Sequence, residues 1–334
     1  MKSVLVTGAE GFIGSHLVQK LISKKIKVRA FVQYNSFNNW GWLEDLKSSE
    51  KKKLDIYLGD IRDINSVKKS LKNCDAVAHL AALIAIPYSY VSPDTYIDTN
   101  IKGTTNILQC CREMKIKKII HTSTSEVYGT AKYIPIDENH PLQGQSPYAA
   151  TKIGADQIAL SFYRSFDLPI VILRPFNTFG PRQSARAIIP TIITQALKKN
   201  KIKLGNLTPT RDFNYIDDTV NAFIKCLLSK KNLSGEVINI GSNYEISIQK
   251  TVHEILKILK INKDDILLND KNRHRPKKSE VDRLWCNNKK AKRLLNWKPK
   301  YSGIHGFKKG LLKTIDWFRK EDNLKKYKAD IYNV

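Results

Sequence analysis

The sequence predicts an α/β protein built on a doubly wound parallel sheet. Short apolar, β-branched runs alternate with helical stretches as far as Arg174 and Pro175, and a glycine-rich turn directly follows the first run. Strands that alternate with helices are joined by right-handed crossovers, which place helices on both faces of a parallel sheet. At 334 residues the chain is long enough to bury one large core or two modest ones.

Six strands are expected in this regular part of the chain, each a run of residues that favour strands. They span residues 2–6, 27–32, 54–58, 76–80, 118–122 and 170–173. Helices are expected between them, from the glycine-rich turn to Lys20 and over residues 66–72 and 99–114. This alternation supports a parallel sheet throughout.

Beyond Pro175 the pattern is less regular. It predicts helices over residues 190–199, 251–259 and 306–320, with short strands near 203–204 and over 236–240. Because no linker rich in proline, glycine or serine separates the two parts, we expect them to pack together. The polar tail after Glu321 is expected to be loosely held.

The composition excludes several classes of protein. The five cysteines form no C-x-x-C pair and no even framework, which indicates a reduced, cytoplasmic setting. No signal peptide is visible, and no run approaches the roughly 18 apolar residues of a membrane helix, so no membrane association is expected. His274 has no histidine or cysteine partner at ligand spacing, so no metal site is predicted.

The net charge of +26 is the most unusual feature of the composition. We find no nucleic-acid-binding module and no basic stripe interleaved with aromatic residues, so no nucleic-acid partner is expected. Two interpretations remain open. The charge is either a solvated surface that reflects a biased composition, or a means of steering a diphosphate substrate.

A dinucleotide fingerprint follows the first strand, where three glycines with G-x-x-G-x-x-G spacing open a helix. The first glycine permits a tight turn, the second lets a pyrophosphate approach the backbone, and the third allows close helix packing. The residues after the third and fourth strands support the same site. The sequence therefore predicts a Rossmann domain whose contacts to NAD or NADP come from Gly8, Gly11, Phe12, Ile13, Gly14, Asp60, Ile61, Leu80, Ala81 and Ala82.

The end of the second strand bears on the choice between NAD and NADP. NAD sites usually place a carboxylate there to bind the ribose 2′-hydroxyl. Residues 32–35 (Val-Gln-Tyr-Asn) contain no acid, and this absence favours NADP. Arg29, the nearest arginine, lies inside the strand, so the residues do not decide the matter.

Tyr148 and Lys152 form a Tyr-x-x-x-Lys pair on one face of an expected helix. A free tyrosine has a pKa of about 10 and is a poor base at neutral pH. A nearby ammonium group and the charge of a nicotinamide ring favour the phenolate and lower this pKa. The pair is therefore predicted to serve hydride transfer, rather than to be incidental surface residues.

The chain resembles the extended short-chain dehydrogenase/reductase family over nearly its whole length. The resemblance is carried by the three glycines, Ser123, the Tyr148–Lys152 pair and the segment 174–177 (Arg-Pro-Phe-Asn). It implies that Thr124 binds a sugar 4-hydroxyl and that Lys152 supports the Tyr148 base. It further implies that Asn100, Tyr148 and Lys152 adjoin the cofactor, which is tightly bound and regenerated in each turnover.

Glu126, in the run 123–129 (Ser-Thr-Ser-Glu-Val-Tyr-Gly), distinguishes the subfamilies. The 4-epimerases usually lack this carboxylate, whereas a 4,6-dehydratase needs a base for the C5 proton. The dTDP-glucose dehydratases have an aspartate as the acid just before it, and here that residue is Ser125. GDP-mannose dehydratases have the same Ser-Glu pair, and UDP-glucuronate decarboxylases share the run, so the decarboxylase and epimerase alternatives stay open.

Three longer segments resemble the N-acetylglucosamine 4,6-dehydratases of legionaminic acid biosynthesis: residues 34–43, 81–90 and 143–148. This resemblance implies a UDP- or GDP-linked N-acetylglucosamine substrate. A diphosphate needs fixed positive charge and planar donors, and the segments similar to the family's nucleotide-binding elements supply Asn177, Arg186, Arg211 and Arg275.

Family analogy also implies a homodimer formed by helices around residues 99–114 and 148–164. It implies two domains. The dinucleotide-binding Rossmann domain is expected at residues 1–178, with a return segment at about 212–242. The sugar-nucleotide-binding domain is expected at residues 179–211 and 243–330.

Overall fold

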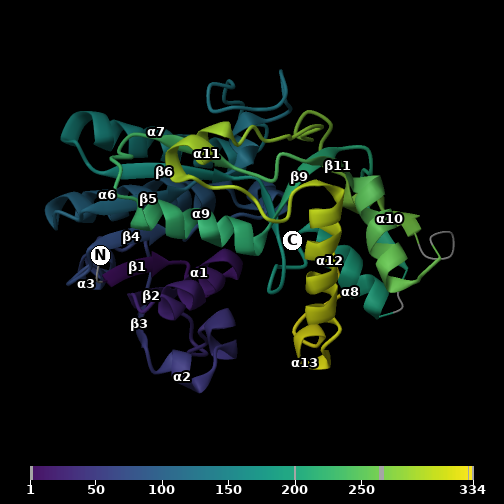
Figure 1. Ribbon diagram of the computed structural model, residues 1–334, viewed down its shortest axis with the longest axis horizontal. Helices are drawn as coiled ribbons and strands as arrows, with labels where there is room; N and C mark the ends of the chain where they lie inside the picture. The colour runs from purple at the N-terminus through teal and green to yellow at the C-terminus, as the bar shows by residue number, and fades with distance from the viewer. Residues whose placement is uncertain (1–2, 199–200, 263–266, 330, 333–334) are drawn as a thin grey trace.

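A seven-stranded parallel sheet forms the centre of the molecule, in the order β10-β6-β5-β4-β1-β2-β3 (Figure 1). The computed structural model describes residues 3–198, 201–262, 267–329 and 331–332. The strands are β1 (Ser3–Thr7), β2 (Lys27–Gln33), β3 (Leu54–Gly59), β4 (Ala76–His79), β5 (Lys118–Thr122), β6 (Ile170–Pro175) and β10 (Val237–Ile240). The strand order runs outward from β1 in both directions, which confirms the doubly wound α/β fold. The expected strand over 236–240 supplies its edge.

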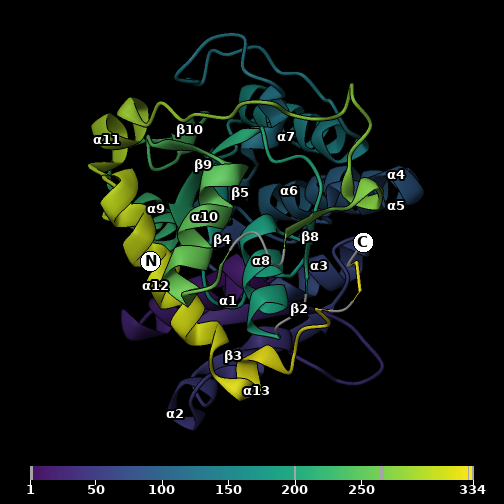
Figure 2. The ribbon, with the colours of Figure 1, turned by 90° about the vertical axis from the view of Figure 1, so that its right-hand side faces the viewer.

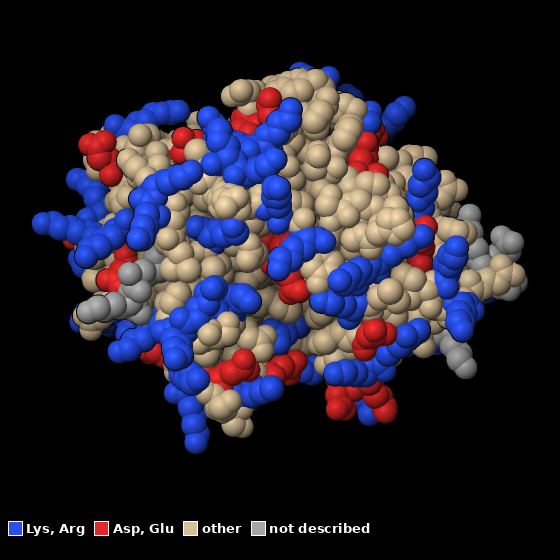
Figure 3. Space-filling model, in the orientation of Figure 1, with Lys and Arg blue, Asp and Glu red and all other residues tan. Residues whose placement is uncertain are grey.

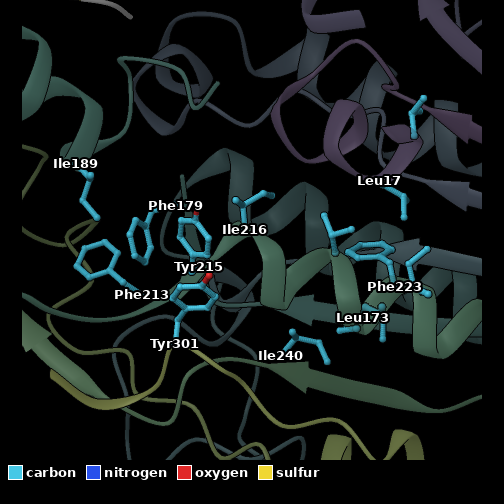
Figure 4. Close-up of a cluster of buried hydrophobic side chains, with 14 of the residues drawn as sticks. Leu17, Leu173, Phe179, Ile189, Phe213, Tyr215, Ile216, Phe223, Ile240 and Tyr301 are labelled. Atoms are coloured by element: carbon cyan, nitrogen blue, oxygen red, sulfur yellow. The ribbon is translucent and has the colours of Figure 1, made fainter. Parts of the chain in front are cut away.

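Helices cover both faces of this sheet, because each has one apolar side. On one face lie α1 (Phe12–Ser23) and α9 (Ile216–Leu228). Figure 4 shows Leu17 of α1 and Phe223 of α9 in the same buried cluster as Leu173 of β6. The other face carries α3 (Ile64–Ser70), α6 (Gly103–Glu113) and α7 (Pro147–Phe166).

A second group of elements packs beside the carboxyl ends of the large sheet (Figure 2). It contains the three-stranded sheet β11-β9-β7, formed by Glu245–Ser247, Thr210–Tyr215 and Asn177–Phe179. It also contains the parallel pair β8 (Ile202–Leu204) and β12 (Leu267–Asn269). Its helices are α8 (Ile188–Leu197), α10 (Ile248–Leu259) and α12 (Gly303–Phe318).

The predicted helices and the strand near 203–204 are confirmed here, whereas β7, β9 and β11 were not predicted. Lys2 and Lys199, at the ends of two expected elements, lie outside the described residues. The boundaries between the two expected domains remain a prediction.

Short elements complete the chain. The helices among them are α2 (Ser48–Lys51), α4 (Ile86–Val91), α5 (Pro93–Tyr96), α11 (Lys289–Leu295) and α13 (Glu321–Leu324). Single 3-10 turns occupy Gly41–Asp45, Ser125–Tyr128 and Lys271–Arg273, and a π-helical segment, Ile97–Lys102, leads into α6. The expected helix over 99–114 therefore begins with a wider turn.

Basic side chains are spread over the whole face shown in Figure 3, interleaved with acidic ones. Such a distribution is typical of a solvated surface. All five cysteines are free. Within the described residues, no helix is both long and apolar enough to cross a membrane.

The segment after α12 is held by aromatic packing at Tyr327, which corrects the expectation of a loosely held tail for this part; residues 330 and 333–334 of the tail lie outside the described residues. Tyr327 is only 7% exposed and stacks on Trp42, with 6.0 Å between the ring centroids. It also contacts Trp317 and Phe318, and its hydroxyl donates to the Gln183 carbonyl at 3.0 Å. Apolar burial overrides the polar composition of this segment.

Tyr327→Ala is expected to lower the free energy of unfolding by about 3–5 kcal/mol, because it removes a buried ring that cannot be replaced by repacking. Denaturant titration measures this change. Tyr34→Ala is the matched control, since Tyr34 is 68% exposed and its loss is expected to cost no more than about 0.5 kcal/mol. Equal effects of the two substitutions would contradict the buried packing of Tyr327.

Candidate active site

A cavity of about 1230 Å³ opens at the carboxyl ends of the parallel strands, where ligands bind in open α/β sheets. It is lined from the large sheet on one side and from α8 and β9 on the other. The predicted site residues that line it are Gly8, Gly11, Phe12, Ile13, Gly14, Asp60, Ile61, Leu80, Ala81, Ala82, Thr124, Ser125, Glu126, Tyr148, Lys152, Asn177, Arg186, Arg211 and Arg275.

The glycine-rich turn packs closely against the main chain around it, which side chains at these positions would prevent. Gly8 has a φ of +63°, and a Cβ added to it would lie 2.9 Å from the main chain of Ala81. A Cβ on Gly14 would lie 2.0 Å from the Gly8 carbonyl oxygen. Helix α1 starts after Gly11, whose position offers no side chain to cap the exposed N–H groups. These features fit the pyrophosphate of a dinucleotide.

Asn100 is the one predicted site residue that does not line the cavity. Its amide oxygen accepts from the Leu83 main-chain N–H at 2.9 Å, and its nitrogen donates to the Leu83 carbonyl at 3.0 Å. The same nitrogen donates to Thr151 Oγ1 at 3.1 Å. Asn100 thus fastens the loop after β4 to helix α7, behind the cavity wall.

Helix α7 presents Tyr148 and Lys152 to the cavity. Ser146 caps this helix by accepting from the Ala149 N–H at 3.1 Å. Tyr148 is 7% and Lys152 4% exposed, and Lys152 Nζ donates to the Thr122 carbonyl at 2.6 Å. The predicted i, i+4 arrangement is therefore present, with the ammonium group anchored to the end of β5.

In the protein alone, the pKa of Tyr148 is raised above its ordinary value, whereas the lowering predicted from the sequence includes the charge of a nicotinamide ring. Burial is the largest cause, and the charge of Glu126 adds to it, while a hydrogen bond with Thr124 opposes it. Burial also lowers the pKa of Lys152 to about 8, against the opposing charge of Asp156. Burial thus disfavours the charged form of both side chains.

Glu126 lies in the 3-10 turn that follows β5. Thr124 caps this turn, accepting from the Glu126 N–H at 3.2 Å. The Glu126 side chain is 8% exposed, and its charge acts on two neighbours, the phenol of Tyr148 and the guanidinium of Arg211. A buried carboxylate therefore lies close to the candidate base and to a cation.

A buried polar network centred on Asp156 lies one helical turn beyond Lys152. It was not predicted from the sequence. Asp156 is fully buried, accepts from Ser123 Oγ at 2.7 Å, and lies 3.0 Å from Arg174 Nη2. Burial alone would raise the pKa of Asp156, but the contact with His121 and the charge of Arg174 hold it below its usual value. Asp156 follows Lys152 by one helical turn, and that spacing was an available signal.

The opposite wall carries a pair of arginines held by one acid. Arg211 Nη2 and Arg275 Nη1 each lie 3.7 Å from the same Glu280 oxygen. Burial lowers the pKa of Arg211, and the charge of Glu126 opposes that shift. Asn177 Oδ1 is buried and has no hydrogen-bond partner among the described residues. The wall thus offers two adjacent cations and an amide to an anionic ligand.

Although residues 32–35 contain no acid, the structure places a carboxylate from another segment at the end of β2. It belongs to Glu10, whose Oε1 accepts from the Gln33 N–H at 2.9 Å. Arg29 cannot help bind a phosphate here, since it pairs with Asp55 at 2.6 Å and does not line the cavity.

Comparisons with known proteins agree with this geometry. A family model described as GDP-mannose 4,6 dehydratase matches residues 5–309. The human dTDP-D-glucose 4,6-dehydratase is 30% identical over 322 residues, which cover 95% of this chain and 90% of the human protein.

Two solved structures are similar over almost the whole chain. One is DesIV, the dTDP-glucose 4,6-dehydratase of Streptomyces venezuelae with NAD bound, with a TM-score of 0.86 and 27% identity. The match covers 98% of this chain and 99% of DesIV. The other is UDP-glucuronic acid 4-epimerase of Bacillus cereus in complex with UDP-glucuronic acid and NAD, with a TM-score of 0.85, 31% identity, and coverage of 95% and 99%.

Dehydratases and epimerases thus both match this chain in sequence and fold. The Tyr-x-x-x-Lys pair, the glycine-rich turn and the matched length agree on one conclusion. The chain belongs to the extended short-chain dehydrogenase/reductase family of NAD-dependent sugar-nucleotide epimerases and dehydratases.

Proposed function

We propose that this protein is a nucleotide-sugar 4,6-dehydratase that converts UDP- or GDP-linked N-acetylglucosamine to the 4-keto-6-deoxy sugar. The observation that carries the proposal is the buried carboxylate of Glu126 beside Tyr148. A 4-epimerase only oxidises and reduces C4, so one base suffices for it. Dehydration also removes the C5 proton, and that step requires a second base within the cavity.

Each residue of the cluster then has one task. Tyr148, as a phenolate supported by the ammonium group of Lys152, takes the proton of the sugar 4-hydroxyl and becomes a phenol, and Thr124 binds the same hydroxyl. A bound nicotinamide supplies reversible hydride transfer. Oxidation at C4 makes the C5 proton acidic, and Glu126 removes it.

The proton taken from C5 can serve the leaving group. Ser125 occupies the place where dTDP-glucose dehydratases have an aspartate, and its side chain, 2% exposed, is not an acid at neutral pH. Glu126 therefore delivers its proton to the departing 6-hydroxyl, the C6–O bond breaks, and water leaves. Hydride addition at C6 and a solvent proton at C5 complete the 4-keto-6-deoxy product.

The substrate assignment combines the cavity with the resemblance. Arg211 and Arg275, fixed side by side by Glu280, suit the two negative charges of a diphosphate. Parts of the segments 34–43 and 81–90, which resemble the legionaminic acid enzymes, line the cavity. These features support an N-acetylglucosamine nucleotide and a role in legionaminic acid biosynthesis.

The remaining assignments follow from the family. The cofactor is NAD or NADP, kept bound and regenerated in each turnover. The enzyme forms a homodimer through the helices around residues 99–114 and 148–164 and acts in the cytoplasm. The choice between NAD and NADP depends on the charges at the end of β2.

Mass spectrometry of the product tests the proposed function. The protein is incubated in D₂O with UDP- and with GDP-N-acetylglucosamine, and UDP-glucuronate serves as a third substrate. We expect an N-acetylglucosamine nucleotide that has lost one water and gained one deuterium at C5. Unchanged mass with an inverted C4 would make the enzyme an epimerase, and loss of carbon dioxide from UDP-glucuronate would make it a decarboxylase.

A further inference from the structure

Glu10, in the glycine-rich turn, places its carboxylate at the C-terminal end of β2. Glu10 Oε1 accepts from the N–H of Gln33, the last residue of β2, at 2.9 Å. The main-chain carbonyl of Glu10 accepts from the Trp42 N–H at 3.0 Å. Gly41 has a φ of +53°, and a Cβ there would lie 2.8 Å from that same carbonyl oxygen. Glu10 is therefore fixed by the strand end and by the loop that follows it.

The second oxygen of this carboxylate is not satisfied by the protein. Glu10 Oε2 is buried and has no hydrogen-bond partner among the described residues, and Glu10 lines the cavity. Burial raises the pKa of Glu10, which the hydrogen bond from Gln33 partly offsets. A buried carboxylate oxygen without a donor is costly, so this atom is suited to accept a hydrogen bond from a ligand.

We propose that Glu10 binds the ribose 2′-hydroxyl of the adenosine half of the cofactor and so selects NAD over NADP. In dinucleotide-binding sheets this hydroxyl is read by an acid at the end of the second strand. Here that strand ends at Gln33 and is followed by Tyr34, and the turn supplies the acid instead. A 2′-phosphate would bring further negative charge against the buried carboxylate, which opposes its binding.

The cations at this end of the cavity are already engaged. Arg62 Nη2 lies 2.5 Å from Asp60 Oδ2, and Lys326 Nζ lies 2.5 Å from Asp45 Oδ1. Arg182 donates hydrogen bonds to Ser15 Oγ and Gln19 Oε1 of α1, each at 3.3 Å. The acids Asp60 and Asp45 are likewise paired. Among the described residues, Glu10 is the lining carboxylate whose buried oxygen lacks a donor. A 2′-phosphate would have to displace an existing ion pair.

Binding of NADH and NADPH to the full-length protein, freed of nucleotide, tests this assignment by calorimetry. The inference rests on the proposed function only in taking a nicotinamide dinucleotide as cofactor. Because the binding measurement uses no sugar, it can show a lack of NAD selectivity independently of whether the protein dehydrates a sugar nucleotide. We expect NADH to bind at least about tenfold more tightly than NADPH.

Glu10→Gln keeps the acceptor for the Gln33 N–H and removes the charge. We expect it to narrow the NADH-to-NADPH affinity ratio by about tenfold or more. Glu50→Gln removes the same charge from α2, outside the cavity, and is expected to leave the ratio within about twofold of the wild type.

Equal affinity of the wild-type protein for the two nucleotides would overturn the inference. So would a ratio that Glu10→Gln leaves unchanged, or one that Glu50→Gln shifts by the same factor. If Glu10→Gln does not fold, the wild-type ratio and the nucleotide that co-purifies with the protein decide. NAD in the denatured extract agrees with the inference, and NADP contradicts it.

Discussion

Glu126→Gln is expected to abolish the loss of water while leaving oxidation at C4 intact. Glutamine keeps the size of the side chain and cannot accept the C5 proton, so dehydration falls by about 100- to 10,000-fold. Tyr148 and Lys152 are unchanged, and hydride transfer from C4 still proceeds. Product mass reports the first effect, and the absorbance of the reduced nicotinamide, which should persist, reports the second.

Glu50→Gln provides the control for this variant, because it removes a carboxylate from α2 that does not line the cavity. A Glu126→Gln enzyme that still released water within about tenfold of the wild-type rate would show that another group is the C5 base. Loss of oxidation and dehydration to the same extent would instead assign Glu126 a structural role.

Tyr148→Phe is expected to stop the reaction one step earlier, before any reduced nicotinamide forms. The phenolate of Tyr148 is the group placed to take the 4-hydroxyl proton, and without it we expect kcat to fall by about 100- to 10,000-fold. Rapid-mixing absorbance after addition of the sugar nucleotide measures this step directly. Nucleotide binding should be retained, since the ring itself remains.

Tyr96→Phe is the matched control for Tyr148→Phe. The Tyr96 ring lies 6.3 Å from the Tyr148 ring, yet Tyr96 does not line the cavity and its hydroxyl donates to the Ala85 carbonyl at 2.5 Å. Its loss should cost about 1 kcal/mol of stability and leave hydride transfer in place. If both variants lost the step equally, packing rather than proton transfer would explain the effect.

The sequence predicted the parts of the site that local spacing determines. The glycine-rich turn and the Tyr148–Lys152 pair each lie within one strand–turn–helix or one helix, so their geometry follows from the backbone alone. The large sheet was predicted for the same reason, because its strands are short runs rich in apolar and β-branched residues. Strands β7 and β11 have three residues each, too few for a period to emerge.

What the sequence missed depends on contacts between distant segments. Glu10 supplies the carboxylate missing from β2 because its turn lies against that strand, 23 positions away in the chain. Asn100 carries a family resemblance, but tertiary packing directs its amide to Leu83 and Thr151. The pKa of Tyr148 depends on burial, which spacing does not report.

The C-terminal segment shows the same limit. Its composition is polar, and the packing of Tyr327 against Trp42 joins positions far apart in the sequence. Asp156 was within reach of sequence reasoning, since it lies one turn beyond Lys152. Its place in a buried network depends on contacts with His121 of β5 and Arg174 of β6, which are distant in the sequence.

The path of the C4 hydrogen tests the central claim most directly. The protein is incubated in ordinary water with UDP- or GDP-N-acetylglucosamine carrying deuterium at C4, and the product is analysed by NMR. A 4,6-dehydratase that returns hydride from its bound cofactor places this deuterium at C6 of a 4-keto-6-deoxy sugar. Deuterium that remains at C4 in a product of unchanged mass would contradict the account and identify an epimerase.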